Sequence, residues 1–513
     1  MHTNKTKVFV KDVGEIKKKM GSVAVAAGIL TLISFGLKGV GMLFRVYLSK
    51  RMGGSGLGLY QLIMSVYSVF ATFASSGFGV AVSRMAAERL DTDGKRGGAF
   101  RVLAASSVLA LSMGGVGATV LYFGAEPLAH SLVGDAGTAS ALKVLALSMP
   151  FMSLSACLKG YFTALGQIYK PALASLFEQA AKIGITVYCF SVFCSRPVSA
   201  TRLCMGVVAG LTAGECFSYI FLFVLYLFFS GEKGGKVSEP FLQSIKAVGG
   251  VTMPIAASAY VTNLLHSVES VLIPARFVLY GGDRDKALAD FGVIRGMSIP
   301  LLFFPYAFLG ALLSIQVPKV SRLNVAEDKG ERNRVVAEIM ETTVGFSALC
   351  GGFFLMFAKP LSLAVYGNTD AASSLWMLAW VTPFMYVETM ADGLLKAIGQ
   401  QKRTLLYSVI NSAFRIVAVL FFIPVSGARG YVYLLMVSNT LSFALCYGRL
   451  KKVTGIRLGT VVYKIAAAVA FSLGGAYLLN LVPMGSATVR TVLCSAACGL
   501  LYLLCMGRRL RRC

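Results

Sequence analysis

Residues 150–167, PFMSLSACLKGYFTALGQ, recur as residues 383–400, PFMYVETMADGLLKAIGQ, 233 positions further along the chain. Seven of the eighteen positions are identical, and the same displacement carries Lys182 onto Arg415 in the apolar segment that follows each copy. Agreement in one register across two successive segments indicates a duplication rather than a chance match around two prolines. Parallel repeats of this kind are typical of secondary transporters, which hold their substrate between the two halves.

Apolar segments of about twenty residues extend from both copies toward the ends of the chain, and each is long enough to cross a bilayer as a helix. Apolar residues make up 56% of the 513 positions and charged residues only 14%, whereas soluble proteins carry about 25% charged residues. The sequence therefore predicts an all-α integral membrane protein with about 14 transmembrane helices, and it leaves no stretch for a soluble catalytic domain. The predicted spans are 22–44, 57–82, 102–123, 141–165, 172–194, 203–229, 243–268, 291–316, 336–357, 372–396, 404–423, 430–448, 460–481 and 488–506.

The duplication and the spans together predict the organisation of the chain. Two parallel six-helix repeats, residues 22–230 and 243–450, are followed by two extra helices in residues 460–507. Basic tails, residues 1–21 and 508–513, flank these helices. The first tail leads into a full-length apolar segment without a small-residue cleavage signature, so we interpret it as a cytoplasmic tail and not as a signal peptide.

Basic residues gather in alternate loops of this predicted topology. The chain carries 49 Lys and Arg against 23 Asp and Glu, a net charge of +26. Thirty-one of the basic residues fall in the two tails and every second loop, and ten fall in the opposite loops. Because cytoplasmic loops are enriched in Lys and Arg, this pattern places both termini in the cytoplasm. The charge thus reflects membrane topology, and we expect membrane lipids but no nucleic acid as partners.

The sequence also lacks the marks of a cofactor site. Almost all of its eleven cysteines lie inside apolar segments or at their ends, without a C-x-x-C pair or a histidine at ligand spacing. We interpret them as small buried residues and expect no metal and no cofactor. The chain has no P-loop pattern for ATP. We therefore expect an ion gradient, the membrane potential or consumption of the product to supply the energy.

Charged residues fall inside the predicted spans, where one charge at the bilayer centre costs roughly 2.5–3.5 kcal/mol on insertion scales. Such residues usually face a partner or a substrate cavity. Basic residues outnumber acidic ones within the spans, and a surplus of buried positive charge is what an anionic headgroup such as a diphosphate requires. We predict that the residues binding this group are Lys38, Arg45, Lys182, Arg295 and Arg415.

Local spacing offers carboxylate partners to some of the intramembrane lysines. Two pairs stand four residues apart in the favourable order: Glu178 with Lys182, and Asp392 with Lys396. Arg415 differs, because Asn411 occupies the position that corresponds to Glu178. Arg45 has a second interpretation, in which its side chain reaches the outer membrane surface.

Glu269 is a candidate for ion coupling. It lies in HSVESVLIPAR, five residues before Pro274, and a carboxylate beside carbonyls freed by a proline forms a plausible cation or proton site. The alternatives are an ion pair with Arg276, on the same face if the helix continues, or exposure at the membrane interface. The further candidates for ion coupling are Glu388 and Asp392.

Two stretches of the chain resemble a known family. Residues 34–90, SFGLKGVGMLFRVYLSKRMGGSGLGLYQLIMSVYSVFATFASSGFGVAVSRMAAERL, and residues 150–173, PFMSLSACLKGYFTALGQIYKPAL, resemble the polysaccharide-exporter branch of the MATE-like (multidrug/oligosaccharidyl-lipid/polysaccharide) superfamily. Within it they look closest to the stage V sporulation protein B and lipid II flippase-like group. The resemblance implies a V-shaped pair of six-helix lobes that moves an undecaprenyl-diphosphate-linked sugar across the bacterial cytoplasmic membrane by alternating access. It also implies that the last two helices form a groove for the polyprenyl tail.

The resemblance extends to two candidate binding residues. Lys38, three positions before Gly41, matches a basic residue that lipid II flippases carry in their first helix, and Arg295, five before Pro300, matches one in their eighth. The basic residue of their second helix is absent, since Tyr60 to Ser83 carry no charge. Lipid II for peptidoglycan is thus the leading cargo, and a capsule, teichoic or spore-cortex precursor remains open.

Two other functions compete with a lipid-linked sugar flippase. A multidrug or cation antiporter of the same superfamily would favour carboxylates over lysines in its cavity. A membrane glycosyltransferase or polymerase would need a large external loop, and the longest one, around residues 276–290, is short. The sequence therefore favours a transporter, which we expect to be a monomer and not an enzyme.

Overall fold

The computed structural model describes residues 3–93, 96–193, 199–229 and 241–456, with residues 470 and 474. Its first part contains α1 (Thr3–Ser75), α2 (Phe78–Asp93), α3 (Arg96–Phe123), α4 (Ala125–Leu128), η1 (Ala129–Val133), η2 (Ala136–Thr138), α5 (Ala139–Ala164), α6 (Tyr169–Phe193) and α7 (Ala200–Phe229). Its second part contains α8 (Phe241–Gly281), α9 (Arg284–Gly292), η3 (Val293–Ser298), α10 (Ile299–Phe303), α11 (Tyr306–Val325), α12 (Lys329–Tyr366), α13 (Ala372–Ala379), α14 (Thr382–Ala397), α15 (Gln401–Phe421) and α16 (Ile423–Thr454).

Eight helical segments of the described chain are long and apolar enough to cross a membrane, or nine if the bent pair Arg284–Phe303 and Tyr306–Val325 is one span. Large apolar side chains point outward from them: Phe123, Phe228 and Phe421 are 78%, 79% and 75% exposed. Exposed apolar surface on this scale requires lipid as its solvent. The protein is therefore an all-helical, multi-pass membrane protein.

The predicted number of fourteen spans is not reached within the described residues. One counted segment, Ile33–Leu90, contains residues 33–44 of the first predicted span and all of the second. Helices α13 and α14, with 8 and 16 residues, are each shorter than a span. The predicted spans 460–481 and 488–506 lie outside the described residues, apart from residues 470 and 474. Fourteen spans, and the extra helices in residues 460–507, thus remain predictions.

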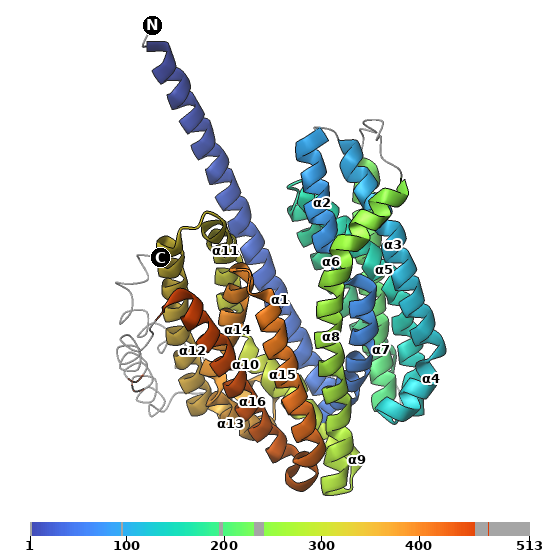
Figure 1. Ribbon diagram of the computed structural model, residues 1–513. Helices are drawn as coiled ribbons and strands as arrows, with labels where there is room; N and C mark the ends of the chain where they lie inside the picture. Colours follow the sequence, from blue (N-terminus) through green and yellow to red (C-terminus); the bar gives the residue numbers. More distant parts are fainter. Residues whose placement is uncertain are drawn as a thin grey trace.

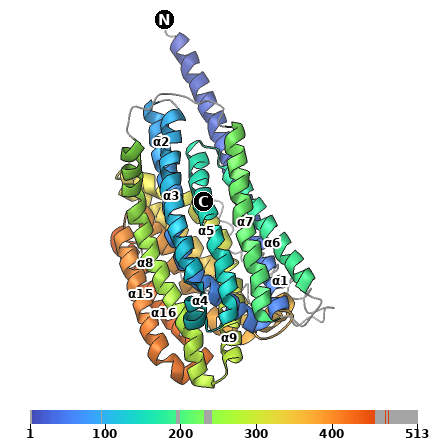
Figure 2. The same cartoon turned by 90° about the vertical axis from the view of Figure 1, so that its right-hand side faces the viewer.

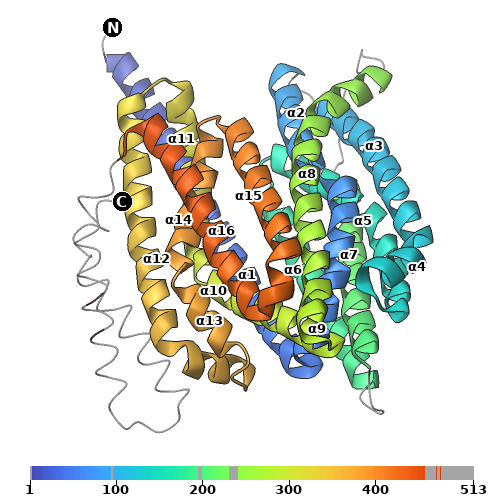
Figure 3. The ribbon, with the colours of Figure 1, turned by 60° about the horizontal axis from the view of Figure 1, so that its bottom comes forward.

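The helices form two groups that lie side by side. Helices α2 to α7 pack together, α10 to α16 pack together, and α1 and α8 run between the groups (Figure 1, Figure 3). Helix α8 contacts α2 and α3 on one side and α15 and α16 on the other. One buried apolar cluster fills the first group around Phe78, Phe162 and Leu222. The predicted boundaries 22–230 and 243–450 remain predictions, since α8 touches both groups.

Helix α1 contains a sharp break at Gly53. This residue has φ 66° and ψ −172°, a conformation that only glycine adopts readily. The helix is continuous on both sides of the break, and its first part extends beyond the other helices (Figure 1, Figure 2). The prediction of a second span over residues 57–82 was wrong in its end, because α1 stops at Ser75 and α2 begins at Phe78.

The first and second parts of the chain meet closely where α1 passes α9. A Cβ atom added to Gly58 would lie 2.0 Å from the backbone oxygen of Leu288, and one added to Gly292 would lie 2.0 Å from that of Gly54. Backbones approach this closely only where glycine supplies no side chain. Close by in the sequence, Arg284 Nη2 donates a hydrogen bond to the carbonyl oxygen of Val133 at 2.8 Å, and this bond also joins the two groups. The contact lies at the end of the molecule opposite the N-terminus (Figure 1).

The predicted loop around residues 276–290 is mostly helical. Helix α8 continues to Gly281 and α9 starts at Arg284, so only a short turn separates them. Gly282, with φ 73°, makes this turn, and the Asp283 side chain caps α9 by accepting a hydrogen bond from the Asp285 amide. The prolines at 254 and 274 lie inside α8 without ending it.

Candidate functional site

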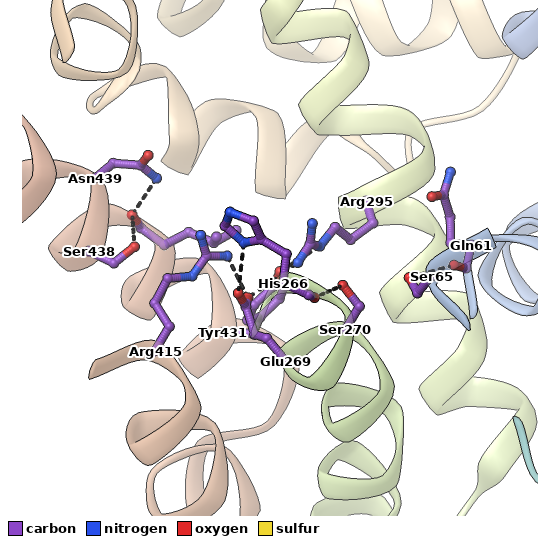
Figure 4. Close-up of polar contacts among 11 residues, drawn as sticks. Gln61, Ser65, His266, Glu269, Ser270, Arg295, Arg415, Tyr431, Ser438 and Asn439 are labelled. Carbon is purple, nitrogen blue, oxygen red and sulfur yellow. Dashed lines mark hydrogen bonds and ion pairs between the residues drawn. The ribbon is translucent and has the colours of Figure 1, made fainter. Parts of the chain in front are cut away.

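Glu269 is the centre of a buried charge cluster. Its side chain is fully buried in α8. One of its oxygens, Oε1, accepts a hydrogen bond from Arg415 Nη2 of α15 at 2.5 Å and another from Arg295 Nη2 of η3 at 3.2 Å. Figure 4 shows the two guanidinium groups converging on this carboxylate from different helices. Hydrogen bonds between ionised groups are about twice as strong as neutral ones, so the cluster ties three elements of the fold together.

A surrounding side chain also holds Arg295 in place. Arg295 Nε donates a hydrogen bond to the Tyr431 hydroxyl of α16 at 2.9 Å. The Tyr431 ring is fully buried and packs edge-on against Phe277, with centroids 6.0 Å apart. Arg295 itself lies in η3, a π-helical turn, and π-helical turns recur at functional sites because they redirect a side chain. The guanidinium groups are thus positioned before any ligand arrives.

One side of the cluster is accessible. The His266 side chain is 44% exposed and that of Arg295 is 25% exposed, whereas Arg415 is 11% exposed. His266 Nδ1 lies 3.9 Å from Glu269 Oε2, which has no hydrogen-bond partner among the described residues. With His266 neutral, two guanidinium groups and one carboxylate leave a net charge of +1. The cluster therefore presents spare positive charge at its exposed rim.

The structure corrects one expectation about Glu269 and identifies the partner of Arg415. The helix does continue to Arg276, but Glu269 pairs with Arg295 and Arg415 instead, and Arg276 Nε has no hydrogen-bond partner in the described chain. The helix of Arg415 offers no carboxylate four residues earlier, where Asn411 stands. The carboxylate comes from α8, 146 positions earlier in the chain. A partner at that distance leaves no local pattern in the sequence.

A second set of charges lies in the first group of helices. Lys159 Nζ of α5 donates a hydrogen bond to Glu178 Oε2 of α6 at 3.0 Å. The predicted pair of Glu178 with Lys182 was therefore wrong, because a lysine from the neighbouring helix occupies the carboxylate. Lys182 Nζ instead lies over the Phe44 ring of α1, 5.6 Å from its centroid.

Glycines on α7 bring it close to this part of α6. Cβ atoms added to Gly210 and Gly214 would lie 2.6 Å from the Lys182 carbonyl oxygen and 2.8 Å from the Glu178 carbonyl oxygen. Together with Gly206 they form a G-x-x-x-G-x-x-x-G pattern, which lets membrane helices pack with their backbones in contact. This spacing is visible in the sequence and identifies the tightly packed face of α7.

The two candidate residues of α1 lie apart from the buried cluster. Both Lys38 and Arg45 are exposed, and neither forms an ion pair with a described residue. Lys38 Nζ is close to α11, 3.3 Å from where a Cβ of Gly310 would stand. Of the five predicted binding residues, the structure brings Arg295 and Arg415 together. It places Lys38, Arg45 and Lys182 elsewhere, without direct contact to that pair among the described side chains.

The other carboxylates suggested for ion coupling lie on α14. Asp392 accepts a hydrogen bond from Lys396 Nζ at 2.6 Å, which confirms the predicted local pair. Glu388 accepts a hydrogen bond from the neighbouring Thr389 hydroxyl at 3.2 Å, and Cys446 Sγ lies 4.0 Å from its other oxygen. Within the described residues there is no group of three or more acidic, histidine or cysteine side chains placed to hold a metal ion. A role for Glu388 or Asp392 in coupling stays a prediction.

Two solved structures share the fold of this chain. The lipid II flippase MurJ in an inward closed conformation aligns with a TM-score of 0.63 and 14% identity, over 95% of this chain and 99% of that chain. An inward-facing multidrug resistance MATE family transporter of the MOP superfamily aligns with a TM-score of 0.58 and 14% identity, over 83% of this chain and 99% of that one. The chain therefore has the same fold as these two membrane transporters.

The sequence comparisons then give the family. A family model described as polysaccharide biosynthesis protein matches residues 24–283, and the chain belongs to this family. Stage V sporulation protein B of Bacillus subtilis (strain 168) is 24% identical in an alignment of 463 positions, which covers 87% of this chain and 86% of that protein. The uncharacterized membrane protein YabM of the same organism is 20% identical over 95% of this chain and 91% of that protein. These matches confirm the resemblance noted from the sequence.

Proposed function

We propose that the protein is a flippase that moves an undecaprenyl-diphosphate-linked sugar precursor across the bacterial cytoplasmic membrane by alternating access, with lipid II as its leading cargo. The observation that carries the proposal is the pair of guanidinium groups of Arg295 and Arg415, which meet at Glu269 with spare positive charge. A buried cation is costly in lipid. Intramembrane cations therefore usually face a partner or the pathway of a substrate.

The chemistry of the arginines fits a diphosphate. A guanidinium presents five N–H donors in a rigid plane and pairs bidentately with phosphate oxygens. Glu269 accepts a hydrogen bond from Nη2 of each arginine, and the Tyr431 hydroxyl accepts one from Arg295 Nε. Donors on both guanidiniums therefore remain for an anion that approaches from the exposed side, where His266 and Arg295 are accessible.

Lys38, Arg45 and Lys182 would extend the positive charge along the path of the cargo. Lys38 and Arg45 are exposed on the first part of α1, and Lys182 lies beside the same helix at Phe44. We propose that these residues receive the headgroup before or after it reaches the arginine pair. In this scheme α1 carries two of the proposed binding residues, and it contacts helices of both groups.

The proposed orientation places both termini in the cytoplasm, in a monomer with fourteen spans arranged as two six-helix repeats and two extra helices. The close contact of α1 with α9 would then lie on the external side, at the end opposite the N-terminus. The arrangement would be closed to the outside. It would open to the outside when Gly54, Gly58 and Gly292 separate.

The experiment that tests the function is depletion of the protein in a bacterium that has no other flippase of this kind. Lipid II should accumulate in the inner leaflet, and cells should lose their shape as peptidoglycan synthesis stops. Expression of the Arg295→Ala or Lys38→Ala variant should not restore growth, although both proteins reach the membrane at normal levels. Arg84→Ala is the matched control, because Arg84 pairs with Glu88 on an exposed face of α2. Unchanged lipid II distribution after depletion would reject the proposal.

A charge-preserving substitution separates electrostatic binding from packing. Lys38→Arg should retain more activity than Lys38→Gln, because a guanidinium still offers a cation to the diphosphate. Equal loss in both variants would assign Lys38 to structure. The same comparison at Arg45 and Lys182 tests whether they too bind the headgroup.

A spore-cortex precursor is the second candidate cargo. The similarity to stage V sporulation protein B over 87% of this chain favours it. Deletion in a spore-forming bacterium distinguishes the two candidates. Arrest of growth indicates a precursor needed in dividing cells, and normal growth with a defective spore cortex indicates a precursor used only in sporulation.

A further inference from the structure

The buried arginines already have a carboxylate as their partner. Glu269 Oε1 already accepts hydrogen bonds from both Arg295 and Arg415, and the carboxylate is fully buried between them. An anion that binds the two guanidiniums must therefore share them with Glu269 or displace it. Two like charges this close also need a counter-ion when no ligand is present, since like charges in a medium of low dielectric constant repel strongly.

The geometry gives the carboxylate a second place to go. Its other oxygen, Oε2, has no hydrogen-bond partner in the described chain, and His266 Nδ1 lies 3.9 Å from it. A neutral imidazole donates one hydrogen bond. A small rotation of the Glu269 side chain would therefore replace a guanidinium by His266 as the hydrogen-bond donor to the carboxylate. The carboxylate would then keep one hydrogen bond while leaving the arginines. His266 lies one turn before Glu269 on α8, at the exposed rim of the cluster (Figure 4).

We propose that Glu269 is an internal counter-ion that competes with the anionic headgroup of the cargo for Arg295 and Arg415, and that His266 receives the carboxylate when the headgroup is bound. This inference rests on the proposed function in taking the cargo to carry a diphosphate. A diphosphate has more charge and more acceptor oxygens than one carboxylate, so it displaces Glu269 from the arginines while it is held close. When Glu269 returns to the arginines, it expels the diphosphate. A flippase needs such a release step, because tight binding alone would trap its cargo.

Removal of the Glu269 carboxylate tests this mechanism. The mechanism predicts the opposite change in anion binding from a role of Glu269 in structure or in direct binding. If Glu269 competes with the ligand, its removal strengthens anion binding. If it merely holds the arginines in place, its removal weakens anion binding. Glu269→Gln is close in shape and keeps the amide as a polar neighbour of the arginines, but it removes the competing charge.

The test measures binding of inorganic pyrophosphate to the full-length protein in lipid nanodiscs by titration calorimetry. The Glu269→Gln variant should bind pyrophosphate at least about tenfold more tightly than the natural protein. The same variant should flip a lipid-linked diphosphate sugar more slowly in proteoliposomes, because release is impaired. Glu126→Gln is the matched control: Glu126 is an exposed carboxylate that pairs with a single lysine, Lys143, at 2.7 Å. It should change neither measurement.

Two further variants keep the inference open to refutation if Glu269→Gln fails to fold. Glu269→Asp shortens the side chain and loosens its hold on the arginines, so pyrophosphate should bind more tightly than in the natural protein. His266→Leu removes the alternative partner of the carboxylate and should weaken pyrophosphate binding. Unchanged or weaker pyrophosphate binding in both Glu269 variants would overturn the counter-ion role.

The outcomes separate this inference from the proposed function. Flipping of a lipid-linked sugar by the natural protein, with pyrophosphate affinity unchanged in the Glu269 variants, would support the flippase and reject the counter-ion. Tighter pyrophosphate binding in those variants, without flipping of any lipid-linked sugar by the natural protein, would support the counter-ion and reject the flippase.

Discussion

Lys182 and Arg415 stand at corresponding positions of the two sequence copies, but they have different surroundings. Lys182 lies over an aromatic ring, and the nearby carboxylate Glu178 is paired with Lys159 at a site where both side chains are about 30% exposed. Arg415 is 11% exposed and bound to the fully buried Glu269. A deeply buried ion pair is therefore formed at the second of these two corresponding sequence positions.

The difference traces to which helix provides the carboxylate. In the first copy it comes from α6 itself, at Glu178, and the lysine comes from α5. In the second copy Asn411 replaces that carboxylate and Asp392 replaces Lys159, so α8 provides the acid instead. Because α8 lies between the two groups of helices, the arginine pair is tied to the part of the molecule that must adjust when the groups move.

The largest effect is expected from Arg415→Ala. Glu269 would remain buried with Arg295 as its remaining arginine partner, and removal of one partner of a buried pair costs about 3–5 kcal/mol. We expect transport to fall by more than about a hundredfold and the melting temperature to drop. Lys182→Ala removes a cation held by an aromatic ring, worth about 0.5–2 kcal/mol, and should reduce transport much less. Equal losses, measured by flipping in proteoliposomes, would mean that the two copies contribute alike.

The next effect concerns the contact that joins the two regions. Gly58→Val would force its side chain against the backbone oxygen of Leu288, and overpacking of this kind costs about 1–3 kcal/mol. The closed arrangement of α1 and α9 should therefore lose population by about tenfold. A maleimide that does not cross membranes should then label a cysteine placed at Ala289 faster. Gly115→Val is the control, since nothing lies within 4 Å of a Cβ at that position, and faster labelling there too would contradict the assignment.

A third variant makes the second copy more like the first. Asn411→Glu restores on α15 the carboxylate that α6 carries, four residues before Arg415. The new acid should draw the guanidinium partly away from Glu269, and an added pair of this spacing is worth about 0.3–0.5 kcal/mol on an exposed helix. We expect a fall of several-fold in flipping. Asn411→Gln tests side-chain size alone, and an equal fall in that variant would rule out the charge as the cause.

The smallest effect is expected at the pair in the first group of helices. Glu178→Gln leaves Lys159 without its partner, but both side chains are partly exposed, and such pairs contribute about 1 kcal/mol or less. The melting temperature should fall slightly, with transport largely retained. A loss as large as that of Arg415→Ala would show that the first copy has a buried site of equal weight.

The helical membrane architecture was predictable because lipid exposure imposes long apolar runs on the sequence. The positions of helix breaks and helix ends were less predictable, because they depend on single residues. The break at Gly53 depends on a positive φ, and a glycine inside an apolar stretch does not reveal whether its φ will be positive. The end of α1 at Ser75, and the continuation of α8 past Pro274, depend on packing between helices that local propensity does not encode.

The charged residues were identifiable from the sequence, but their partners were only partly so. Asp392 and Lys396 pair as predicted, because both lie on one face of α14. The same spacing failed for Glu178 and Lys182, where Lys159 arrives from another helix. Arg295 and Arg415 were selected as isolated charges that face a site. Their shared carboxylate and the supporting Tyr431 hydroxyl depend on contacts between distant segments, which a single sequence does not reveal.

The path of α1 has a consequence for the biosynthesis of the protein. Lys38, in the first part of this helix, lies beside Gly310 of α11, which follows it by 272 positions in the chain. At roughly 5–20 residues per second, the ribosome completes that neighbour on the order of 15–50 s after Lys38 has been made. During this interval the first helix holds a cationic side chain in the membrane without its final neighbour. The contact of α1 with α11 therefore forms only after the first group of helices, α2 to α7, has been synthesised.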